Sequence, residues 1–523
     1  MRKAMLLFFF LFAGLSAQPK NFFDKQAWPG YSSIDPNDLR AHLTFLASDE
    51  LEGRETTFRG QKVAAQYIAA WFSRLRLKPG GTNGTYFQPF ELDNDRVDPS
   101  TSISIKNNRG TRSFVFGKDF LSNATLDTTF SSVPVFVGFF DSPRTPEEET
   151  ALADKIVVLL AGQRDTSEAG RQRGRRSMFR AFRNAAAVLV VINEKEGTID
   201  DLAKSFAGFL QKGSFSLRES ARRGGSTPTV FISPTVAEEL LAGLNSTLSR
   251  LRENLMSDST FHPIPLKNVT VTLDFNVHHE VKTSENVIGI LEGSDPVLKN
   301  EYVVLTAHYD HVGVNPASGD VYNGADDDGS GTSMILELAE AFAMNPRKPK
   351  RTIVFMTVAG EEKGLLGSSY YTSHPIVPLE NTLANINMDM IGRIDPKHRS
   401  QNEPYVYIIG SDKISTELDS LLQAANRQTV NLALDYQYND DNDPNQFYRR
   451  SDHYNFARNG VPIAFFFTGV HEDYHRPTDT VDKIEFDRMA MIGKLMYATT
   501  WKAAEFPRML RKDGKPSVYS GGQ

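Results

Sequence analysis

Residues 302–310 read Tyr-Val-Val-Leu-Thr-Ala-His-Tyr-Asp, and this stretch decides the expected fold. Its first six residues are apolar, aromatic or β-branched, which predicts a buried strand. Similar apolar runs lie at 352–358, 383–388, 405–409 and 463–467, and helical patterns lie between them at 330–344 and 415–426. Because strands that alternate with helices form sheets covered by helices, we expect an α/β fold with a mixed, mostly parallel central sheet.

Acidic or histidine residues follow four of these strands directly. They are His308 and Asp310, Glu361 and Glu362, Asp389, and the segment 471–479. In sheets of this kind, functional groups gather just beyond the carboxyl ends of the strands. A single charged strand end is commonly a solvated loop, but four from one sheet would converge on a common rim. The sequence therefore predicts a reaction centre at this edge.

A glycine-flanked turn at 324–331 carries three consecutive carboxylates, Asp326, Asp327 and Asp328, directly before a helix. An acidic helix cap would explain one of them. Three adjacent carboxylates repel one another, which predicts a bound cation among them. Calcium competes for this role because oxygen-rich loops favour hard cations. The nearby histidines favour zinc, which takes nitrogen and carboxylate oxygen together.

The composition sets limits on the class of protein. With 523 residues the chain is long enough for two or three packing units. Its net charge of -6 gives no reason to expect a nucleic-acid partner, because such binding depends on a basic surface. Cysteine is absent, which excludes disulfides, thiolate zinc sites and a cysteine nucleophile. Every metal ligand must then be His, Asp or Glu.

The N-terminus has the three-part pattern of a secretory signal. Two basic residues, Arg2 and Lys3, precede an apolar run at 4–12 and small residues that end at Ala17. A membrane span needs about 20 apolar residues, so we expect cleavage near Ala17 and no stable membrane anchor. The chain is then predicted to be exported, to the periplasm or to the extracellular medium.

The pattern of apolar and polar residues changes between the N-terminal part of the chain, which we expect to be helical, and the strands described above. Short apolar runs separated by polar loops occupy this part, without a cluster of His, Asp and Glu at ligand spacing. We interpret it as an inserted lid or substrate-shaping domain. The predicted organisation is a signal at 1–17, a first part of the catalytic domain at 18–124, the insert at 125–265, the catalytic domain at 266–510 and a tail at 511–523.

Five short blocks together resemble a known family. They are 307–310 (Ala-His-Tyr-Asp), 324–331 (Gly-Ala-Asp-Asp-Asp-Gly-Ser-Gly), 359–368 (Ala-Gly-Glu-Glu-Lys-Gly-Leu-Leu-Gly-Ser), 387–390 (Asn-Met-Asp-Met) and 474–475 (Tyr-His). In this order they resemble the signature blocks of the zinc peptidase family that includes bacterial leucyl aminopeptidases and glutamate carboxypeptidase II. The stretch 51–54 resembles the family's N-terminal portion. The insert resembles the protease-associated (PA) domain, and the implied fold is phosphorylase/hydrolase-like.

The resemblance implies a site for two zinc ions. His308, Asp327 and Asp389 would hold one ion, and Asp327, Glu362 and His475 the other. Asp327 is the bridge because the family's bridging Asp lies two residues before a glycine, here Gly329, although Asp326 and Asp328 remain alternatives.

Two further acidic residues are expected behind the ligands. Asp310 should accept the second ring hydrogen of His308, as outer-shell carboxylates do for zinc-bound histidines. Asp452, in the stretch Ser451-Asp452-His453, resembles a family feature near the site, although Ser451 itself could be only a helix cap. We predict no serine nucleophile, because the strand-turn-helix context of such a serine is missing.

The expected chemistry is hydrolysis by a metal-bound hydroxide. Two zinc ions and three ligand carboxylates leave one positive charge, which a bound hydroxide cancels; zinc lowers the pKa of bound water to about 7. Adjacent residues on an extended segment point to opposite sides, so Glu361 is free of the metals and is expected to be the general base. Tyr474 is the candidate that hydrogen-bonds the oxyanion, as in family members, unless it only forms an aromatic wall.

The leading hypothesis is an exported two-zinc metallo-aminopeptidase that acts on peptides. A carboxypeptidase or dipeptidase like glutamate carboxypeptidase II would need cationic residues that face the substrate carboxylate, and the sequence does not place them; Arg393 could do so or form an ordinary ion pair. A relative of glutaminyl cyclases would work with one zinc. A binding ectodomain of the transferrin-receptor type would have lost the ligands. Substrate side-chain preference and oligomeric state are not predicted.

Overall fold

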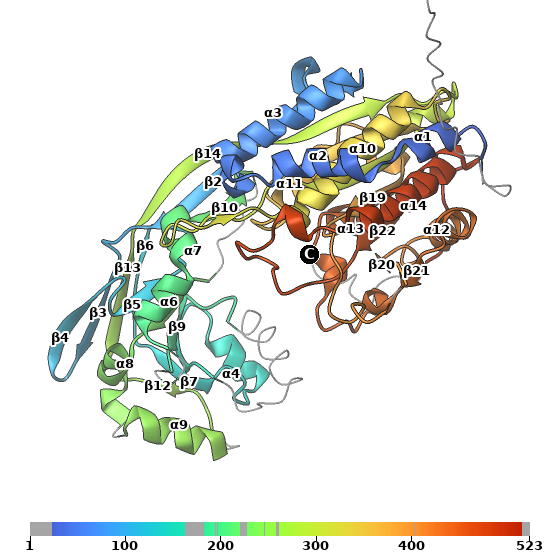
Figure 1. The fold of residues 1–523 in the computed structure, drawn as a ribbon. Coiled ribbons are helices and arrows are strands. Elements are labelled where there is room, and N and C mark those ends of the chain that lie inside the picture. The colour runs from blue at the N-terminus through green and yellow to red at the C-terminus, as the bar shows by residue number, and fades with distance from the viewer. Residues whose placement is uncertain are drawn as a thin grey trace, which may run out of the picture.

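The computed structural model describes residues 24–162, 182–193, 195, 197–219, 227–244, 246–257, 261–401 and 403–514. The predicted signal at 1–17 and most of the predicted C-terminal tail lie outside these residues. Within the described part, the chain forms two lobes joined by two long strands (Figure 1). No helix among the described residues combines the length and apolar character needed to cross a bilayer.

The first lobe is built on a large mixed sheet with the strand order β10-β2-β14-β18-β15-β19-β22-β20-β21, with β1 paired to β14. These strands are β10 (Ser214–Leu217), β2 (Phe87–Val97), β14 (Val277–Leu291), β18 (Thr352–Val358), β15 (Tyr302–His308), β19 (Thr382–Met388), β22 (Ile463–Phe467), β20 (Tyr405–Ile409), β21 (Ala433–Asp435) and β1 (Lys78–Pro79). The central strands β18, β15, β19 and β22 are parallel neighbours. Their carboxyl ends therefore share one edge.

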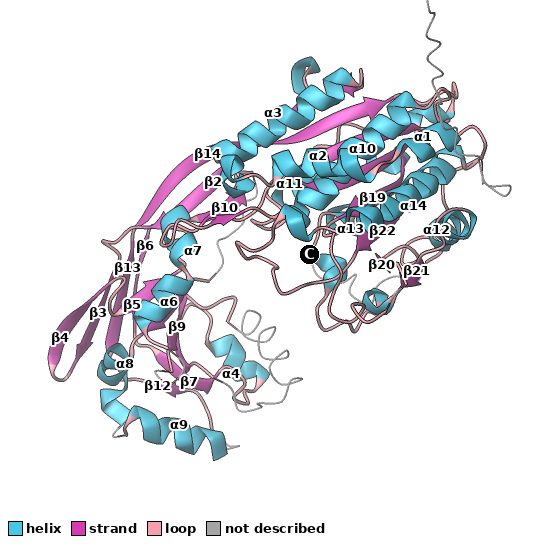
Figure 2. Ribbon diagram, in the orientation of Figure 1, coloured by secondary structure: helices cyan, strands magenta, loops and turns pink. Residues whose placement is uncertain are grey.

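Helices cover both faces of this sheet (Figure 2). They are α1 (Trp28–Ser33), α2 (Pro36–Leu46), α3 (Arg59–Arg74), α10 (Gly331–Met344), α11 (Leu366–Ser373), α12 (Thr416–Gln428), α13 (His453–Arg458) and α14 (Phe486–Glu505). Successive strand residues face opposite sides. Accordingly Val303 and Leu305 of β15 belong to the core with α10 and α14. Val304 belongs to a second core with Tyr371 and Phe456, from α11 and α13.

The second lobe contains two further sheets. One has the order β12-β7-β8-β9-β11-β5, and the other β4-β3-β13-β6. The strands are β12 (Ile264–Pro265), β7 (Val135–Phe139), β8 (Ile156–Leu160), β9 (Ala187–Val191), β11 (Thr229–Ile232), β5 (Phe120–Ser122), β4 (Gly110–Val115), β3 (Ser102–Asn107), β13 (Thr270–Phe275) and β6 (Thr128–Ser132). Helices α4 (Pro146–Ala151), α6 (Ile199–Ser205), α7 (Ala207–Lys212), α8 (Pro234–Leu241) and α9 (Leu248–Ser257) accompany them.

The second lobe is wider than the predicted insert at 125–265. Strands β3, β4 and β13 lie outside that range, yet Ile103 and Val271 share one core with Val158 of β8. Conversely β10, inside the range, pairs with β2 of the large sheet. The reason is that β2 pairs with β14 along the whole length of β2, from Val97 to Phe87, and both strands run from one lobe into the other (Figure 1). The boundaries of the domains stay a prediction.

The remaining short elements lie in loops. They are the hairpin β16 (Gly313–Val314) and β17 (Val321–Tyr322), the turn η5 (Ala325–Ser330), and the single turns η1 (Asp49–Arg54), η2 (Thr82–Gly84), η3 (Ala242–Leu244), η4 (Leu298–Asn300), η6 (Leu379–Asn381), η7 (Gln437–Asn439), η8 (Phe447–Arg449) and η9 (Val481–Lys483). The predicted α/β class with a mixed sheet is confirmed. The sheet is partly rather than mostly parallel, because β2, β14 and β10 pair antiparallel at one side.

Candidate functional site

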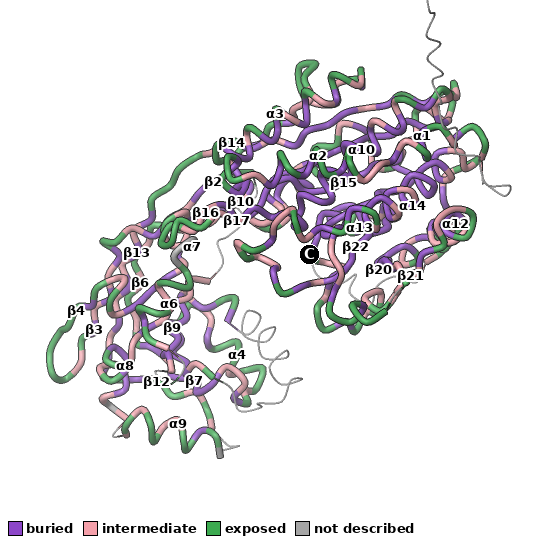
Figure 3. Tube along the Cα trace, viewed as in Figure 1, coloured by how far each residue is buried: buried purple, intermediate pink, exposed green. Residues whose placement is uncertain are grey.

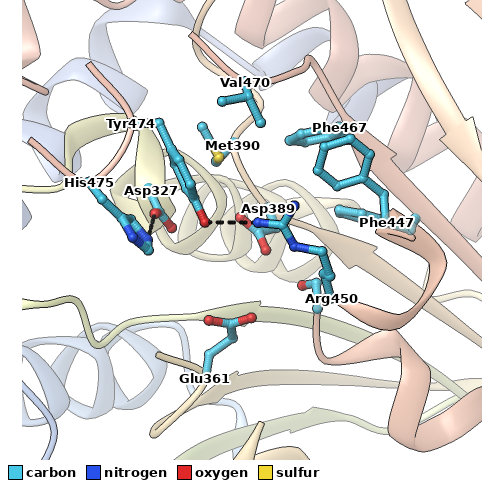
Figure 4. A pocket seen from close by; sticks show the side chains of 12 residues that line it. Asp327, Glu361, Asp389, Met390, Phe447, Arg450, Phe467, Val470, Tyr474 and His475 are labelled. Carbon is cyan, nitrogen blue, oxygen red and sulfur yellow. Dashed lines mark hydrogen bonds and ion pairs between the residues drawn. The ribbon is translucent and has the colours of Figure 1, made fainter. Parts of the chain in front are cut away.

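The carboxyl ends of the four parallel strands bring the predicted site residues together. His308 is the last residue of β15, and Asp389 follows β19 directly. Glu361 and Glu362 lie in the turn after β18, and His475 in the loop after β22. Asp327 comes from η5, which precedes α10. Figure 4 shows Asp327, Asp389 and His475 on one side of a pocket, with the carboxylate of Glu361 directed toward them from the other.

One group of three side chains matches the first predicted ion. The Nε2 atom of His308 lies 3.2 Å from Oδ1 of Asp327 and 3.6 Å from Oδ1 of Asp389. Each of these residues offers one donor atom, and the three atoms lie within 4.8 Å of one another. Ligand atoms of a tetrahedral zinc lie about 3.3 Å apart, so the spacing fits one ion.

The second predicted group shares Asp327. Its other oxygen, Oδ2, lies 3.0 Å from Nε2 of His475, which is 3.2 Å from Oε2 of Glu362. Burial lowers the pKa of His475, but Asp327 and Glu362 outweigh this effect and raise it to about 10. Asp327 therefore turns one carboxylate oxygen toward each group, as a bridging ligand would.

A further histidine, which we did not predict, lies in the second group. His311 is buried, and its Nδ1 atom is 2.8 Å from Oε1 of Glu362 and 3.8 Å from Oδ2 of Asp327. It forms a candidate metal group with these two carboxylates. The signal in the sequence was its position three residues after His308, in the loop that follows the same strand.

The three consecutive carboxylates of η5 have different roles. Asp326 accepts the backbone N–H of Gly392 at 2.6 Å, and Nε2 of His471 lies 3.2 Å from its other oxygen. Asp328 accepts the backbone N–H groups of Gly331 and His308. Hydrogen bonds thus satisfy the outer two, and the middle carboxylate, Asp327, faces the site.

The partner of His308 also differs from the prediction. Its Nδ1 atom lies 3.1 Å from the backbone carbonyl of Asp310, whereas the carboxylate of Asp310 is 3.8 Å away. That carboxylate instead accepts the hydroxyl of Thr56 at 2.6 Å and the backbone N–H of Glu361 at 3.3 Å. Asp310 therefore orients His308 through its carbonyl, and its side chain ties the β15 loop to the turn that carries Glu361.

The predicted general base, Glu361, lies beside the first group. Its Oε2 atom is 4.0 Å from Nε2 of His308, and its side chain is 12% exposed. Burial raises the pKa of Glu361 well above its usual value, and the carboxylates of Glu362, Asp389 and Asp452 raise it further. Divalent cations in the two groups would act in the opposite direction.

Asp452, which the sequence predicts behind the ligands, lies near enough to Glu361 to raise the pKa of Glu361. Its side chain is fully buried, and within the described part of the chain neither carboxylate oxygen has a hydrogen-bond partner. Burial raises its pKa to about 7. The preceding Ser451 accepts a hydrogen bond from the side chain of Asn387 at 3.0 Å, so Ser451 is not a helix cap.

One side of the pocket next to the two groups is apolar. It is lined by Met390, Phe447, Phe465, Phe467 and Val470. In Figure 4, Met390 and Val470 lie above Asp389, and Phe447 and Phe467 lie to its right.

Two polar side chains, Tyr474 and Arg450, also line this pocket. Tyr474 stacks on His475, and its hydroxyl accepts a hydrogen bond from Nη2 of Arg450 at 3.3 Å (Figure 4). Arg393, considered above as a ligand for a substrate carboxylate, is instead paired with Asp473 at 2.9 Å. The cation that lines the pocket is therefore Arg450, which we did not predict from the sequence.

A buried arginine organises the backbone below the ligands. The guanidinium of Arg54 donates to the carbonyls of Tyr309 at 3.0 Å, Asn323 at 2.7 Å and Gly324 at 2.9 Å. Tyr309 directly follows His308, and Gly324 precedes η5, so one side chain ties together the two segments that carry His308 and Asp327. Arg54 is the last residue of the stretch 51–54, which resembles the family's N-terminal portion. The sequence alone indicated no role for this residue.

Comparisons with known proteins find similar peptidases. Residues 286–500 match the sequence profile described as Peptidase family M28. A probable zinc metalloprotease of Pyrenophora teres f. teres is 31% identical over 44% of the chain and 53% of its own length. Aminopeptidase YwaD of Bacillus subtilis is 31% identical over 45% of the chain and 47% of its own length. The chain spans about half the length of these curated relatives.

Two solved structures share the fold over nearly the whole chain. An aminopeptidase from Aneurinibacillus sp. strain AM-1 superposes with a TM-score of 0.55 and 19% identity, covering 95% of this chain and 98% of its own. BSAP, a zinc aminopeptidase from Bacillus subtilis, superposes with a TM-score of 0.51 and 20% identity, covering 92% and 97%. At these identities the likeness shows the fold.

Proposed function

We propose that this chain, whose residues 286–500 belong to peptidase family M28, is a zinc-dependent aminopeptidase that releases N-terminal residues from peptides. The observation that carries the proposal is the position of Asp327, whose two oxygens face two different groups of His and carboxylate ligands. Such a shared carboxylate suits a pair of metal ions. The relatives named as zinc metalloproteases support zinc as the metal.

In this proposal His308, Asp327 and Asp389 hold one zinc ion, and Asp327, Glu362 and His475 hold the other. Bound zinc supplies an acidified water and polarises the peptide carbonyl. The donor set of imidazole and carboxylate is the one that zinc takes in catalytic sites, where an open position is kept for water.

Glu361 moves the proton. One of its carboxylate oxygens takes a proton from the attacking water and then delivers it to the leaving amine, a contribution of about a hundred to ten thousand fold. Tyr474 donates its hydroxyl hydrogen to the oxygen of the tetrahedral intermediate. Burial raises the pKa of Tyr474, so the hydroxyl keeps this hydrogen at neutral pH.

The apolar wall of the pocket suggests the substrate preference. Met390, Phe465 and Val470 offer no charged or hydrogen-bonding group to a side chain that enters. We therefore expect N-terminal leucine, phenylalanine or methionine to be preferred, since burying such a side chain contributes about 1.5–3 kcal/mol.

One observation favours a second candidate, a dipeptidase or carboxypeptidase. Arg450 lines the pocket, and among the described residues no carboxylate lies within ion-pair distance of it. A guanidinium without a carboxylate partner near the reaction centre would bind the carboxylate of a short substrate bidentately. Under this reading Arg450→Met would raise the KM for dipeptides more than the KM for longer peptides.

Export by a signal peptide at 1–17 and a PA-like character of the second lobe remain part of the proposal. Neither has a bearing on the chemistry above. Removal of the signal would be recorded as an N-terminus near residue 18 in protein recovered from the medium or the periplasm.

The decisive experiment is a panel of substrates with and without chelator. Free aminoacyl chromogenic substrates should be cleaved, N-blocked ones should not, and zinc should restore the activity that a chelator removes. Release of C-terminal residues from N-blocked peptides would favour the second candidate. A purified protein without stoichiometric zinc and without peptidase activity would leave only the binding ectodomain considered at the outset.

A further inference from the structure

We infer that His311 is a fourth protein ligand of the second zinc ion, which makes the two ions unequal. The inference rests on the proposed function, since it concerns the same pair of ions. It adds a residue outside the five ligands that the family resemblance implies. Its consequence is that one ion is held by Asp327, Glu362, His475 and His311, and the other by three side chains only.

The distances fit a shared ion. From Nδ1 of His311 the nearest carboxylate oxygens are Oε1 of Glu362 at 2.8 Å and Oδ2 of Asp327 at 3.8 Å. Oδ2 is also the oxygen that lies 3.0 Å from His475. The two imidazole rings stand at 70° to each other with centroids 5.7 Å apart. His311, Asp327 and Glu362 form one candidate metal group, and His475 contacts the same two carboxylates.

His311 is buried with its polar atoms unused. Its side chain is 0% exposed, and among the described residues neither ring nitrogen has a hydrogen-bond partner of acceptable geometry. The same holds for Oε1 of Glu362 and Oδ2 of Asp327, the atoms that face it. Buried polar atoms without partners cost about 1–3 kcal/mol each, so the three that face one another, Nδ1 of His311, Oε1 of Glu362 and Oδ2 of Asp327, indicate a missing common partner.

The backbone around His311 holds the ring in this position. Its backbone N–H donates to the carbonyl of Arg54 at 3.2 Å. The residue after Arg54, Glu55, forms an isolated β-bridge with His311. The buried carboxylate of Glu55 is in turn paired with Lys212 at 2.6 Å and Lys363 at 3.0 Å. A ligand fixed by such surroundings is preorganised for its ion.

The two ions are expected to have different roles, because one has four protein ligands and the other has three. A tetrahedral zinc with four protein ligands is closed, whereas three ligands leave a position for water. The three-ligand group is the one next to Glu361, whose Oε2 atom lies 4.0 Å from His308. The open position therefore lies beside the proposed base, and the four-ligand position is expected to bind its ion first and release it last.

The competing role for His311 is a hydrogen bond to Glu362, and His311→Asn separates the two. The asparagine amide reaches to where Nδ1 stands and can donate to Glu362, but it is a poor zinc ligand. A matched control is His398→Asn, because His398 is also buried and its Nδ1 atom lies 2.7 Å from a carboxylate oxygen, that of Asp395. The described residues place no candidate metal group there.

The measurement is titration of the metal-free proteins with Co²⁺, followed by visible absorption, and with Zn²⁺, followed by calorimetry. For His311→Asn we expect affinity for the tighter ion to fall by more than about 100-fold, beyond the 10–100-fold typical of outer-shell partners. Its Co²⁺ bands should also change, while His398→Asn keeps both. A smaller loss with unchanged Co²⁺ bands would show that His311 is only a hydrogen-bond donor and would overturn the inference.

A second measurement does not depend on any variant. X-ray absorption of the native protein loaded with one equivalent of zinc should show two imidazoles on the metal, because His311 and His475 fill the tighter position. A single imidazole would overturn the inference. Failure here is distinct from failure of the proposed function: a protein that binds two zinc ions and cleaves peptides keeps that function whatever His311 does.

Discussion

Two buried clusters of carboxylates and imidazoles lie in the first lobe, and they differ in what their polar atoms do. The first, which we call the ligand cluster, consists of His308, His311, Asp327, Glu362, Asp389 and His475. The second, the closed cluster, consists of Asp395, His398, Tyr405 and Tyr407. In the closed cluster Asp395 accepts hydrogen bonds from Nδ1 of His398 at 2.7 Å and from the hydroxyl of Tyr407 at 2.7 Å.

In the ligand cluster, by contrast, several buried atoms have no partner within the described residues, among them Nε2 of His308 and Oδ2 of Asp327. The members of the closed cluster are buried, as are His308, His311 and Asp327 of the ligand cluster, and Figure 3 shows that the central strands of the first lobe are buried as well. Acidic residues and histidines in a buried place are therefore not enough to indicate a metal. The indication comes from donor atoms that face one another and remain unsatisfied.

The largest expected effect is the loss of both ions when the shared carboxylate is changed. Asp327→Asn removes the charge that belongs to both groups, so zinc content should fall from two ions to fewer than one and peptidase activity to background. The matched change Asp395→Asn should lower the melting temperature and leave the zinc content at two. Metal analysis after dialysis checks both. Equal zinc content in the two variants would remove the distinction between the clusters.

The next effect separates metal binding from proton transfer. Glu361→Gln keeps the size of the side chain and all the ligands, so zinc should stay bound while kcat falls by about a hundred to ten thousand fold. Steady-state kinetics together with metal analysis on the same preparation measures this. If kcat survives within a few fold, another residue is the base, and Asp452, buried near Glu361, becomes the first candidate.

A smaller effect is expected for the arginine below the ligands. Lysine at position 54 keeps a positive charge but cannot span the carbonyls of Tyr309, Asn323 and Gly324. For Arg54→Lys we expect zinc affinity to fall about 10- to 100-fold, as for outer-shell partners of a metal site. The measurement is the rise in melting temperature on adding zinc, which should shrink. A variant that loses equal stability with zinc and with chelator would show that Arg54 supports the fold alone.

These residues also show what the sequence could and could not predict. The strands β15, β18, β19 and β22 have continuous apolar runs that end in charged residues, so their positions and their common edge follow from local pattern. Asp327 followed from the family resemblance, in which the bridging Asp lies two residues before a glycine. His311 and Arg54 were missed because their roles depend on contacts across the fold: Arg54 is 255 residues from the Tyr309 carbonyl that it binds.

The second lobe also shows what local sequence pattern cannot predict. Isoleucines 103 and 105 alternate with polar residues as in any half-buried strand, and this period does not say which sheet receives them. Only pairing with β13, from Thr270 to Asp274, assigns β3 to the second lobe. Pairing between distant segments is long-range information that local pattern does not contain.

The smallest effect concerns an imidazole that belongs to neither cluster. His453 is buried, and its Nε2 atom lies 3.0 Å from the carbonyl of Tyr448; among the residues that the structure describes, it has no carboxylate partner. Burial lowers its pKa to about 3, against the opposing hydrogen bond to Tyr448. The unfolded chain takes up a proton near pH 6.5 and the folded chain does not, so stability contributed by neutral His453 is lost as pH falls from about 6.5 toward 3.

His453→Gln should remove this dependence. At pH 5 the contribution amounts to about 2 kcal/mol relative to pH 7, from roughly 1.5 pKa units at 1.36 kcal/mol each. Urea unfolding of the metal-free protein at both pH values measures it, with the difference between native and variant as the readout, because other groups titrate equally in both. An identical pH slope would mean that His453 gains a proton in the folded state. The distinction between buried polar groups with and without hydrogen-bond partners would then not hold for His453, the simplest of these groups.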